Sequence, residues 1–206
     1  MWARQIRSEG VVGPKASVAF HTWTVDTGPI LDAVTEVWDQ IANDLAKNEV
    51  PSAAGRLRRH MEYVAAELAD ELGAQVRFKG DGSYDMGELL SSVIKRQGDL
   101  LKLAGKAARS WKNDAAVSKV EELQTARSKI LSESNDEQWA INKAIHYNEW
   151  FALSKNDFAP VVAVFKRLLE QFRCEKCDTW LSVVPRHDPM ELRCSCGHFH
   201  LNLNEK

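Results

Sequence analysis

Four cysteines near the end of the chain have the types and spacing of a metal site. Two residues separate Cys174 from Cys177, one separates Cys194 from Cys196, and sixteen residues lie between the two pairs. Two thiolates at such spacing can bind one metal from a tight turn, and a hairpin can bring the second pair alongside to complete a tetrahedron. The pattern predicts a zinc ribbon with Cys174, Cys177, Cys194 and Cys196 as the ligands.

The fourth ligand has an alternative. His198 and His200 follow the second pair. Because histidine nitrogen is also a common zinc ligand, either residue could replace Cys196. Four protein ligands leave no coordination position for a water or a substrate, so the zinc is expected to be structural.

The other interpretation of the cysteines is two unrelated pairs, buried or joined in disulfides. A disulfide framework is typical of secreted chains. The first seven residues, Met-Trp-Ala-Arg-Gln-Ile-Arg, run into polar sequence without the apolar core of a signal peptide. We therefore expect reduced thiols and a cytoplasmic location.

Composition predicts one sizeable domain with a small appendix. The 206 residues are 44% apolar and 27% charged, which is enough to bury a real core. A net charge of -2 provides no overall basic field, so contact with DNA would need a local patch. No apolar run approaches the roughly 20 residues of a membrane helix, so no membrane partner is expected.

One local basic patch is present, formed by Arg56, Arg58 and Arg59. It could bind the phosphates of DNA or an acidic protein partner. Positive charge near the start of a helix is unfavourable for the helix dipole, which makes the cluster informative. The alternative is a solvated helix face on which the arginines pair with Glu62 and Glu67, about one turn further along.

The elements that must position these residues are mainly helical. Alternating β-formers predict short strands at 17–25 and 74–79. Apolar residues at helical spacing predict helices at 30–48, 51–72, 88–111, 115–131, 138–150 and 157–172. Pro160 is expected in the first turn of the last helix, with Asn156 or Asp157 as its N-cap. The predicted fold is a helical bundle at 1–172, with a short β element near the N-terminus, followed by the zinc ribbon at 173–206.

Motifs for catalysis are largely missing. The chain has no Gly-x4-Gly-Lys-Ser/Thr loop, so it cannot bind ATP by that mechanism on its own, and a non-catalytic role is expected. His146, with Asn142, Lys143 and Tyr147 nearby, is the one candidate catalytic group. Helical RNases of the HEPN group use Arg-x4-6-His, but no arginine precedes His146 at that distance. A small HEPN-like RNase or toxin is therefore the alternative function, and hydrogen bonding of His146 within the bundle is the other interpretation.

Several short segments carry a broader similarity. They are residues 1–7, 22–24 with 28–29, 53–62, 83–89 and 144–148, together with the pair Cys174 and Cys177. These segments resemble the C-terminal portion of RecF- and SMC-like ATPases of the kind found near DNA-repair and phage-defence genes. The nucleotide-binding motifs of that family lie upstream of the matching region, and this chain lacks them. The resemblance implies either a truncated relative or a binding module that acts beside a separate ATPase chain and contacts DNA or a protein partner.

Overall fold

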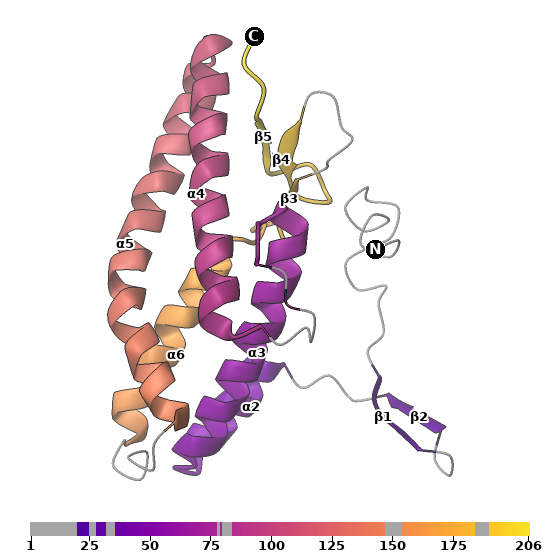
Figure 1. Cartoon of the computed structure of the whole chain (residues 1–206), viewed down its shortest axis with the longest axis vertical. Helices are drawn as coiled ribbons and strands as arrows, with labels where there is room; N and C mark the ends of the chain where they lie inside the picture. The colour runs from indigo at the N-terminus through magenta and orange to yellow at the C-terminus, as the bar shows by residue number, and fades with distance from the viewer. Residues whose placement is uncertain are drawn as a thin grey trace.

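The computed structural model of this chain describes residues 20–24, 28–31, 36–77, 79, 84–146, 154–183 and 190–206, and for 20–24, 28–31 and 134–146 it describes the backbone alone. The described part is mainly helical, as predicted (Figure 1). Its helices are α2 (Val37–Ala46), α3 (Val50–Leu72), α4 (Met86–Ser110), α5 (Asp114–His146) and α6 (Lys155–Glu170). A small sheet of β3 (Ser182–Val183), β4 (Glu191–Arg193) and β5 (His200–Asn202) lies near the C-terminus.

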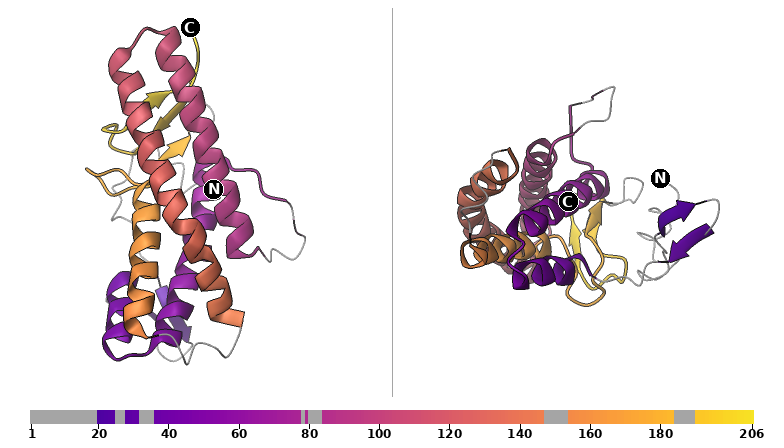
Figure 2. Two further views of the ribbon diagram at one scale, coloured as in Figure 1. Left: turned by 90° about the vertical axis from the view of Figure 1, so that its left-hand side faces the viewer. Right: turned by 90° about the horizontal axis from the view of Figure 1, so that it is seen from below.

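The helices form a bundle because each buries one apolar face. Along α3, Leu57, Met61, Leu68 and Leu72 recur at helical spacing and are each at most 1% exposed. In sequence order, each of α3 to α6 packs against at least one neighbouring helix. Figure 2 shows α4, α5 and α6 lying side by side along the long axis of the molecule. The bundle therefore has a continuous interior for the C-terminal sheet to pack against.

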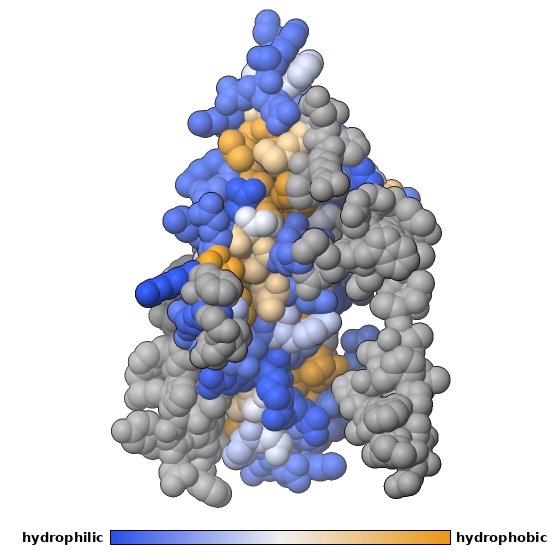
Figure 3. Space-filling model, turned by 45° about the vertical axis from the view of Figure 1, so that its right-hand side comes forward, coloured by the Kyte–Doolittle hydropathy of each residue, from blue (hydrophilic) through white to orange (hydrophobic). Residues whose placement is uncertain are grey.

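Large side chains fill this interior. The largest of those that are fully buried come from α2, α3, α4, α6 and the turn after α6: Phe158, Phe165, Phe172, Ile41, Leu57, Met61, Leu68, Leu72, Leu90, Leu100 and Leu168. On one outer face, hydrophilic side chains predominate and apolar ones form a vertical series of separate patches (Figure 3). Burial of the apolar faces, and not helix propensity, supplies most of the stability of such a bundle.

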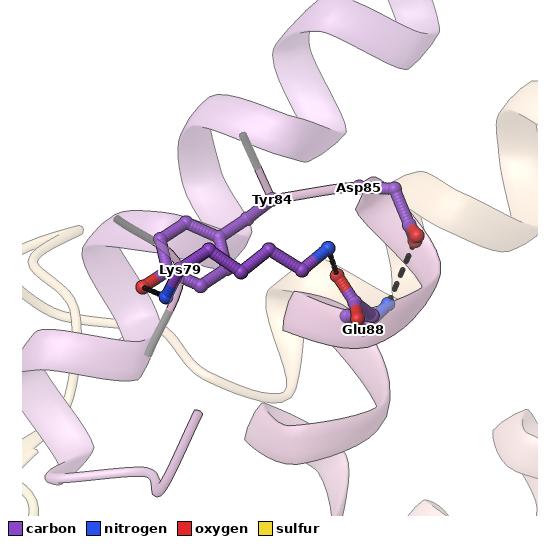
Figure 4. A network of polar contacts seen from close by, with 4 residues as sticks. All are labelled: Lys79, Tyr84, Asp85 and Glu88. Carbon is purple, nitrogen blue, oxygen red and sulfur yellow. Dashed lines mark hydrogen bonds and ion pairs between the residues drawn. The ribbon is translucent and has the colours of Figure 1, made fainter. Parts of the chain in front are cut away.

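The start of α4 is held by a small polar network (Figure 4). The Asp85 carboxylate accepts a hydrogen bond of 2.9 Å from the backbone N–H of Glu88, which satisfies a donor that the first turn leaves free. The Lys79 ammonium pairs with the Glu88 carboxylate, and the Lys79 backbone N–H donates to the Tyr84 hydroxyl at 3.2 Å. These contacts fix the entry into α4 from both sides of residues 80–83.

The first helix is shorter than predicted. α2 begins at Val37, whereas the apolar spacing predicted a start at 30, and the backbone at Gly28–Leu31 forms β2 instead. β2 pairs antiparallel with β1 (Phe20–Thr24), with Thr22 opposite Ile30 and Thr24 opposite Gly28. The glycine and proline at the start of β2 disfavour a helix there. β1 falls within the stretch 17–25, and the rest of that stretch lies outside the described residues.

No strand forms at 74–77 or at 79, so the strand predicted at 74–79 is wrong for the described residues. Gly73 ends α3 in the left-handed conformation, at φ 65°, and turns the chain away from the helix axis. Ala74 and Val76 then pack against the hydrophobic core. The alternation of apolar residues here serves burial against helices, because 74–77 pair with no strand in the described part of the chain.

One continuous helix, α5, replaces the two that were predicted at 115–131 and 138–150; residues 147–150 lie outside the described part. The polar stretch at 132–137 was interpreted as a break, but it contains no glycine or proline. Serine need not interrupt a helix when its hydroxyl bonds within the helix. Ser128 shows this behaviour, because its hydroxyl donates to the carbonyl of Gln124 at 2.9 Å.

The last helix begins earlier than predicted, at Lys155, and Ser154 is the N-cap in place of Asn156 or Asp157. Asp157 instead occupies the third helical position, where its carboxylate accepts from the backbone N–H of Ser154 at 3.1 Å and from its hydroxyl at 2.7 Å. Pro160 lies inside the helix and not in its first turn. Apolar residues at helical spacing along this helix and the turn after it are all buried, namely Val161, Val164, Phe165, Leu168, Leu169 and Phe172.

Candidate metal centre

The first cysteine pair is positioned directly by the end of α6. Gln171 is the C-cap of α6, and Phe172, 1% exposed, anchors the following turn in the core. The backbone N–H of Leu181 donates to the carbonyl of Phe172 at 2.8 Å, which closes a loop around the cysteines. Within this loop, Asp178 takes a positive φ of 55° and its N–H donates to the carbonyl of Cys174 at 2.9 Å. The pair therefore projects from a tight turn mounted on the helix.

The second cysteine pair lies in the turn between β4 and β5. These two strands and β3 form an antiparallel sheet in the order β3-β4-β5, with Leu192 opposite Leu201. Gly197 takes a φ of 72°, a conformation that costs glycine little, and its N–H donates to the carbonyl of Cys194 at 3.2 Å. The turn that the sequence predicted for Cys-x-Cys-Gly is thus present.

The structure brings the four cysteines together. Their Sγ atoms lie within 4.8 Å of one another, and the distances from Cys196 Sγ are 3.9 Å to Cys174 and 3.5 Å to Cys194. Four sulfurs around a tetrahedral zinc, at about 2.3 Å from it, would lie about 3.8 Å apart. None of the four is in a disulfide. The disulfide interpretation is therefore wrong, and the four cysteines could hold a metal ion.

The pKa values of the thiols are consistent with a site that holds a cation between the four sulfur atoms. Burial raises the pKa of the Cys177 thiol. Hydrogen bonds from the side chain and backbone of Thr179 and from Cys196 lower this pKa by more than burial raises it, so that the net pKa is about 5. The backbone N–H of His198 is the largest single influence on the Cys196 thiol and lowers its pKa, but the Cys177 thiol, desolvation and the other two thiols together raise the pKa to about 12. Closely spaced thiols cannot all ionise together in isolation, whereas a bound cation deprotonates each of its thiol ligands.

The histidine alternatives for the fourth ligand do not join the cluster. His200 Nε2 lies 2.8 Å from a carboxylate oxygen of Glu191, on the neighbouring strand. His198 is exposed and is not among the residues whose ligand atoms converge. Cys196 occupies the fourth position, and it is the only exposed cysteine of the four.

Two hydroxyl side chains belong to the site and were not predicted from the sequence. The Thr179 hydroxyl lies 3.0 Å from Cys177 Sγ and 3.1 Å from the Ser195 hydroxyl, so it connects the two turns. Contacts to the sulfur atoms orient metal ligands and adjust their basicity. The sequence could have indicated these two residues by their positions, because Thr179 lies two residues after Cys177 and Ser195 lies between the cysteines of the second pair.

The sheet also packs against the helices. Leu181, Leu192, Leu201 and Leu203 are at most 5% exposed and belong to the same core as the residues of α3 and α4. At the end of α4, the Trp111 indole N–H donates to the carbonyl of Asn204 at 2.9 Å. The ribbon is therefore held against the bundle by its buried leucines and by this hydrogen bond.

The arginine cluster on α3 is partly neutralised. Arg56 Nε lies 2.6 Å from the carboxylate of Asp44, and Arg58 Nε lies 2.7 Å from that of Glu62. Arg59 is exposed and makes no ion pair with another residue in the described part of the chain. The pairing of Arg58 with Glu62 matches the alternative of a solvated helix face. A role of these arginines in binding stays a prediction.

The candidate catalytic group lies largely outside what the structure describes. Asn142, Lys143 and His146 belong to the last turns of α5, where the backbone alone is described, and Tyr147 lies beyond it. The RNase alternative therefore stays a prediction.

Within the described residues, no helix is both long and apolar enough to cross a membrane. A comparison of the chain with protein-family models, with curated proteins and with solved structures finds no match. The similarity to RecF- and SMC-like ATPases thus stays a prediction from short sequence segments.

Proposed function

We propose that this chain is a non-catalytic binding module in which a structural zinc ion holds a ribbon rigidly against a helical bundle. The observation that carries the proposal is the convergence of four cysteine Sγ atoms within 4.8 Å. All four come from this chain and together complete a tetrahedron, so no coordination position remains for a substrate. The metal then stabilises the ribbon and leaves its outer surface for recognition.

Zinc is proposed because a closed set of four thiolates is typical of structural zinc sites, although iron also accepts this geometry. The test is metal analysis of the purified chain together with its cobalt-substituted form. One zinc per chain and the intense sulfur-to-cobalt absorption of four thiolates are expected. One iron per chain, or less than half a metal per chain after purification in zinc-containing buffer, would refute the zinc assignment.

A protein partner fits the ribbon better than DNA does. Residues 173–206 contain five basic residues (Arg173, Lys176, Arg186, Arg193 and Lys206) and five acidic ones (Glu175, Asp178, Asp188, Glu191 and Glu205). DNA binding depends on clustered positive charge that neutralises phosphates. Two of the three clustered arginines on α3 are already paired with carboxylates. The resemblance described above suggests a separate ATPase chain as the partner.

Photocrosslinking from the ribbon surface tests this function. A photoreactive residue replaces exposed Lys176, between the first two cysteines, and in a matched control it replaces exposed Lys95 on α4. We expect a discrete protein adduct in cells from position 176, its loss on mutation of Cys194 to serine, and none from position 95. An adduct with nucleic acid would show that DNA or RNA is the partner. Equal labelling from both positions would refute a specific ribbon surface.

A further inference from the structure

A cavity of about 480 Å³ lies where the bundle meets the first cysteine turn. Its walls include Trp38 from α2, Leu169 and Glu170 from α6, and Trp180 with Glu175 from the cysteine loop. We call it the tryptophan cleft. A concave site with aromatic walls and a few charged groups has the features of a binding pocket. Its position next to the metal centre places it on the proposed recognition surface.

One half of the cleft already holds a cation of the chain itself. The Arg173 guanidinium lies over the ring of Trp180, 4.1 Å from its centroid, and donates to both carboxylate oxygens of Asp178 at 2.8 and 2.9 Å. The negative face of an indole attracts a cation, and a carboxylate fixes its direction. The pair of Trp180 and Asp178 therefore shows how this cleft binds a guanidinium.

The other half has the same chemistry, and among the described residues no cation lies as close to its aromatic ring as Arg173 lies to Trp180. Trp38 is held by an edge contact with His60, whose ring centroid lies 5.0 Å away at an interplanar angle of 83°. Lys166 Nζ, on an exposed side chain, lies over the Trp38 ring at 6.0 Å from its centroid. The carboxylates of Glu170 and Glu175 make no ion pair with any residue that the structure describes.

We infer that the tryptophan cleft binds a cationic side chain, arginine or lysine, of the partner protein between Trp38 and the carboxylates of Glu170 and Glu175. Three acidic and two basic residues line the cleft, so its charge complements a cation and opposes a phosphate chain. Lys166 competes with the incoming cation for the same ring. This inference rests on the proposed function for the class of partner, but the cleft can be tested by itself.

The test uses the zinc-loaded full chain and two short amidated peptides, Gly-Arg-Gly and its citrulline counterpart, which has nearly the same shape without the charge. Binding is followed by NMR at the indole N–H groups of Trp38 and Trp180. We expect the arginine peptide to bind at least fivefold more tightly than the citrulline peptide. Equal affinities would overturn the inference.

Variants decide between a cationic and an anionic ligand. Glu170→Gln should weaken arginine-peptide binding about threefold, and Trp38→Leu about tenfold, within the range of a cation–π contact. Lys166→Ala should strengthen it by removing the competing cation. Glu122→Gln, an exposed charge change on α5, is the matched control and should have no effect. If Lys166→Ala instead weakened binding, Lys166 would not compete with the arginine and the inference would be wrong. If a single-stranded oligonucleotide displaced the peptide, the cleft would be a site for anions and the inference would also be wrong.

The two proposals fail separately. Crosslinking from position 176 without arginine-peptide binding would contradict the cleft alone. Peptide binding without a crosslinked partner would support the cleft and contradict the proposed function of the ribbon. Since Trp38→Leu could disturb α2, the surface variants Glu170→Gln and Lys166→Ala are the decisive ones. Glu170→Gln should weaken peptide binding and Lys166→Ala should strengthen it, and loss of folding cannot produce both changes.

Discussion

The bundle and the ribbon are stabilised by different interactions. In the bundle, the interior is made of large side chains such as Phe158, Phe165 and Leu68, which are fully buried. In the ribbon, strands of two or three residues surround a few buried leucines and the four cysteines. A region of that size cannot bury enough apolar surface to fold without a metal or a neighbouring surface. This ribbon has a neighbouring surface, because its leucines join the core of the bundle, and its four cysteines could hold a metal ion.

Metal removal should give the largest difference between the two regions. Structural zinc contributes about 10 to 16 kcal/mol of binding free energy, which is available only to the folded ribbon. A strong chelator should therefore abolish amide-exchange protection at 190–203, while protection of α3 and α4 persists. Hydrogen exchange with mass spectrometry measures both regions at once. Simultaneous loss of protection in α3 would show that bundle and ribbon form one cooperative unit.

A cavity in the bundle should have the opposite effect to metal removal, because it should destabilise the bundle and leave metal binding by the ribbon intact. Phe165→Ala removes a side chain that is 0% exposed, and we expect it to lower the free energy of unfolding by about 3 to 5 kcal/mol. The variant should still bind one metal per chain, because Phe165 lies within α6, outside the two turns that carry the cysteines. Urea denaturation followed by circular dichroism gives the stability. The control is Val162→Ala on the same helix, half-buried, whose loss should be clearly smaller.

Protonation of His60 should couple the two regions. Burial, and then the positive charge of Arg173, lower the pKa of His60 from 6.5 to about 4 in the folded chain. The unfolded chain thus binds a proton between these values that the folded chain does not, so stability falls as pH decreases from about 6.5 to 4 and is fully present above 6.5. Urea denaturation at pH 7 and pH 5 should show a smaller pH-dependent loss in His60→Gln than in the unchanged chain. Equal losses would mean that other groups, such as the thiols, account for the whole pH dependence.

The smallest effect is expected where the ribbon meets the C-terminal end of α4. Trp111→Phe removes the hydrogen bond from the indole N–H to Asn204 and should lower the free energy of unfolding by about 0.5 kcal/mol, because the side chain is 51% exposed. Thermal denaturation measures the shift, and NMR should confine the changes to residues near 202–206. A loss above about 2 kcal/mol would mean that this contact, and not the metal, seats the ribbon.

Sequence reasoning succeeded where short-range chemistry decides the outcome. The spacing of the cysteines was enough to group them, and the positions of Leu57, Leu68 and Leu72 were enough to place a buried helix face. It was wrong where tertiary packing decides, as for the alternating residues at 74–79. The helix predicted from residue 30 shows the same limitation, because its apolar spacing continued through residues that pair in a strand.

Other features lay beyond sequence reasoning for a different reason. Trp38 and Trp180 line one cleft although more than a hundred residues separate them. Thr179 and Ser195 come into contact only because the two cysteine turns converge. Such pairs depend on the relative placement of helix and ribbon, and no local periodicity encodes that placement.

The direct connection from α6 to the first cysteine turn has a consequence for the direction in which the ribbon faces. Only three residues separate the last residue of α6, Glu170, from Cys174. Each residue of an α-helix turns the chain by about 100°. Because one residue inserted in α6 would turn every residue after it by that angle, it would move the ribbon's leucines away from the core that they join, while the four cysteines could still converge. The angular position of the last turn of α6 thus sets which side of the ribbon faces the bundle.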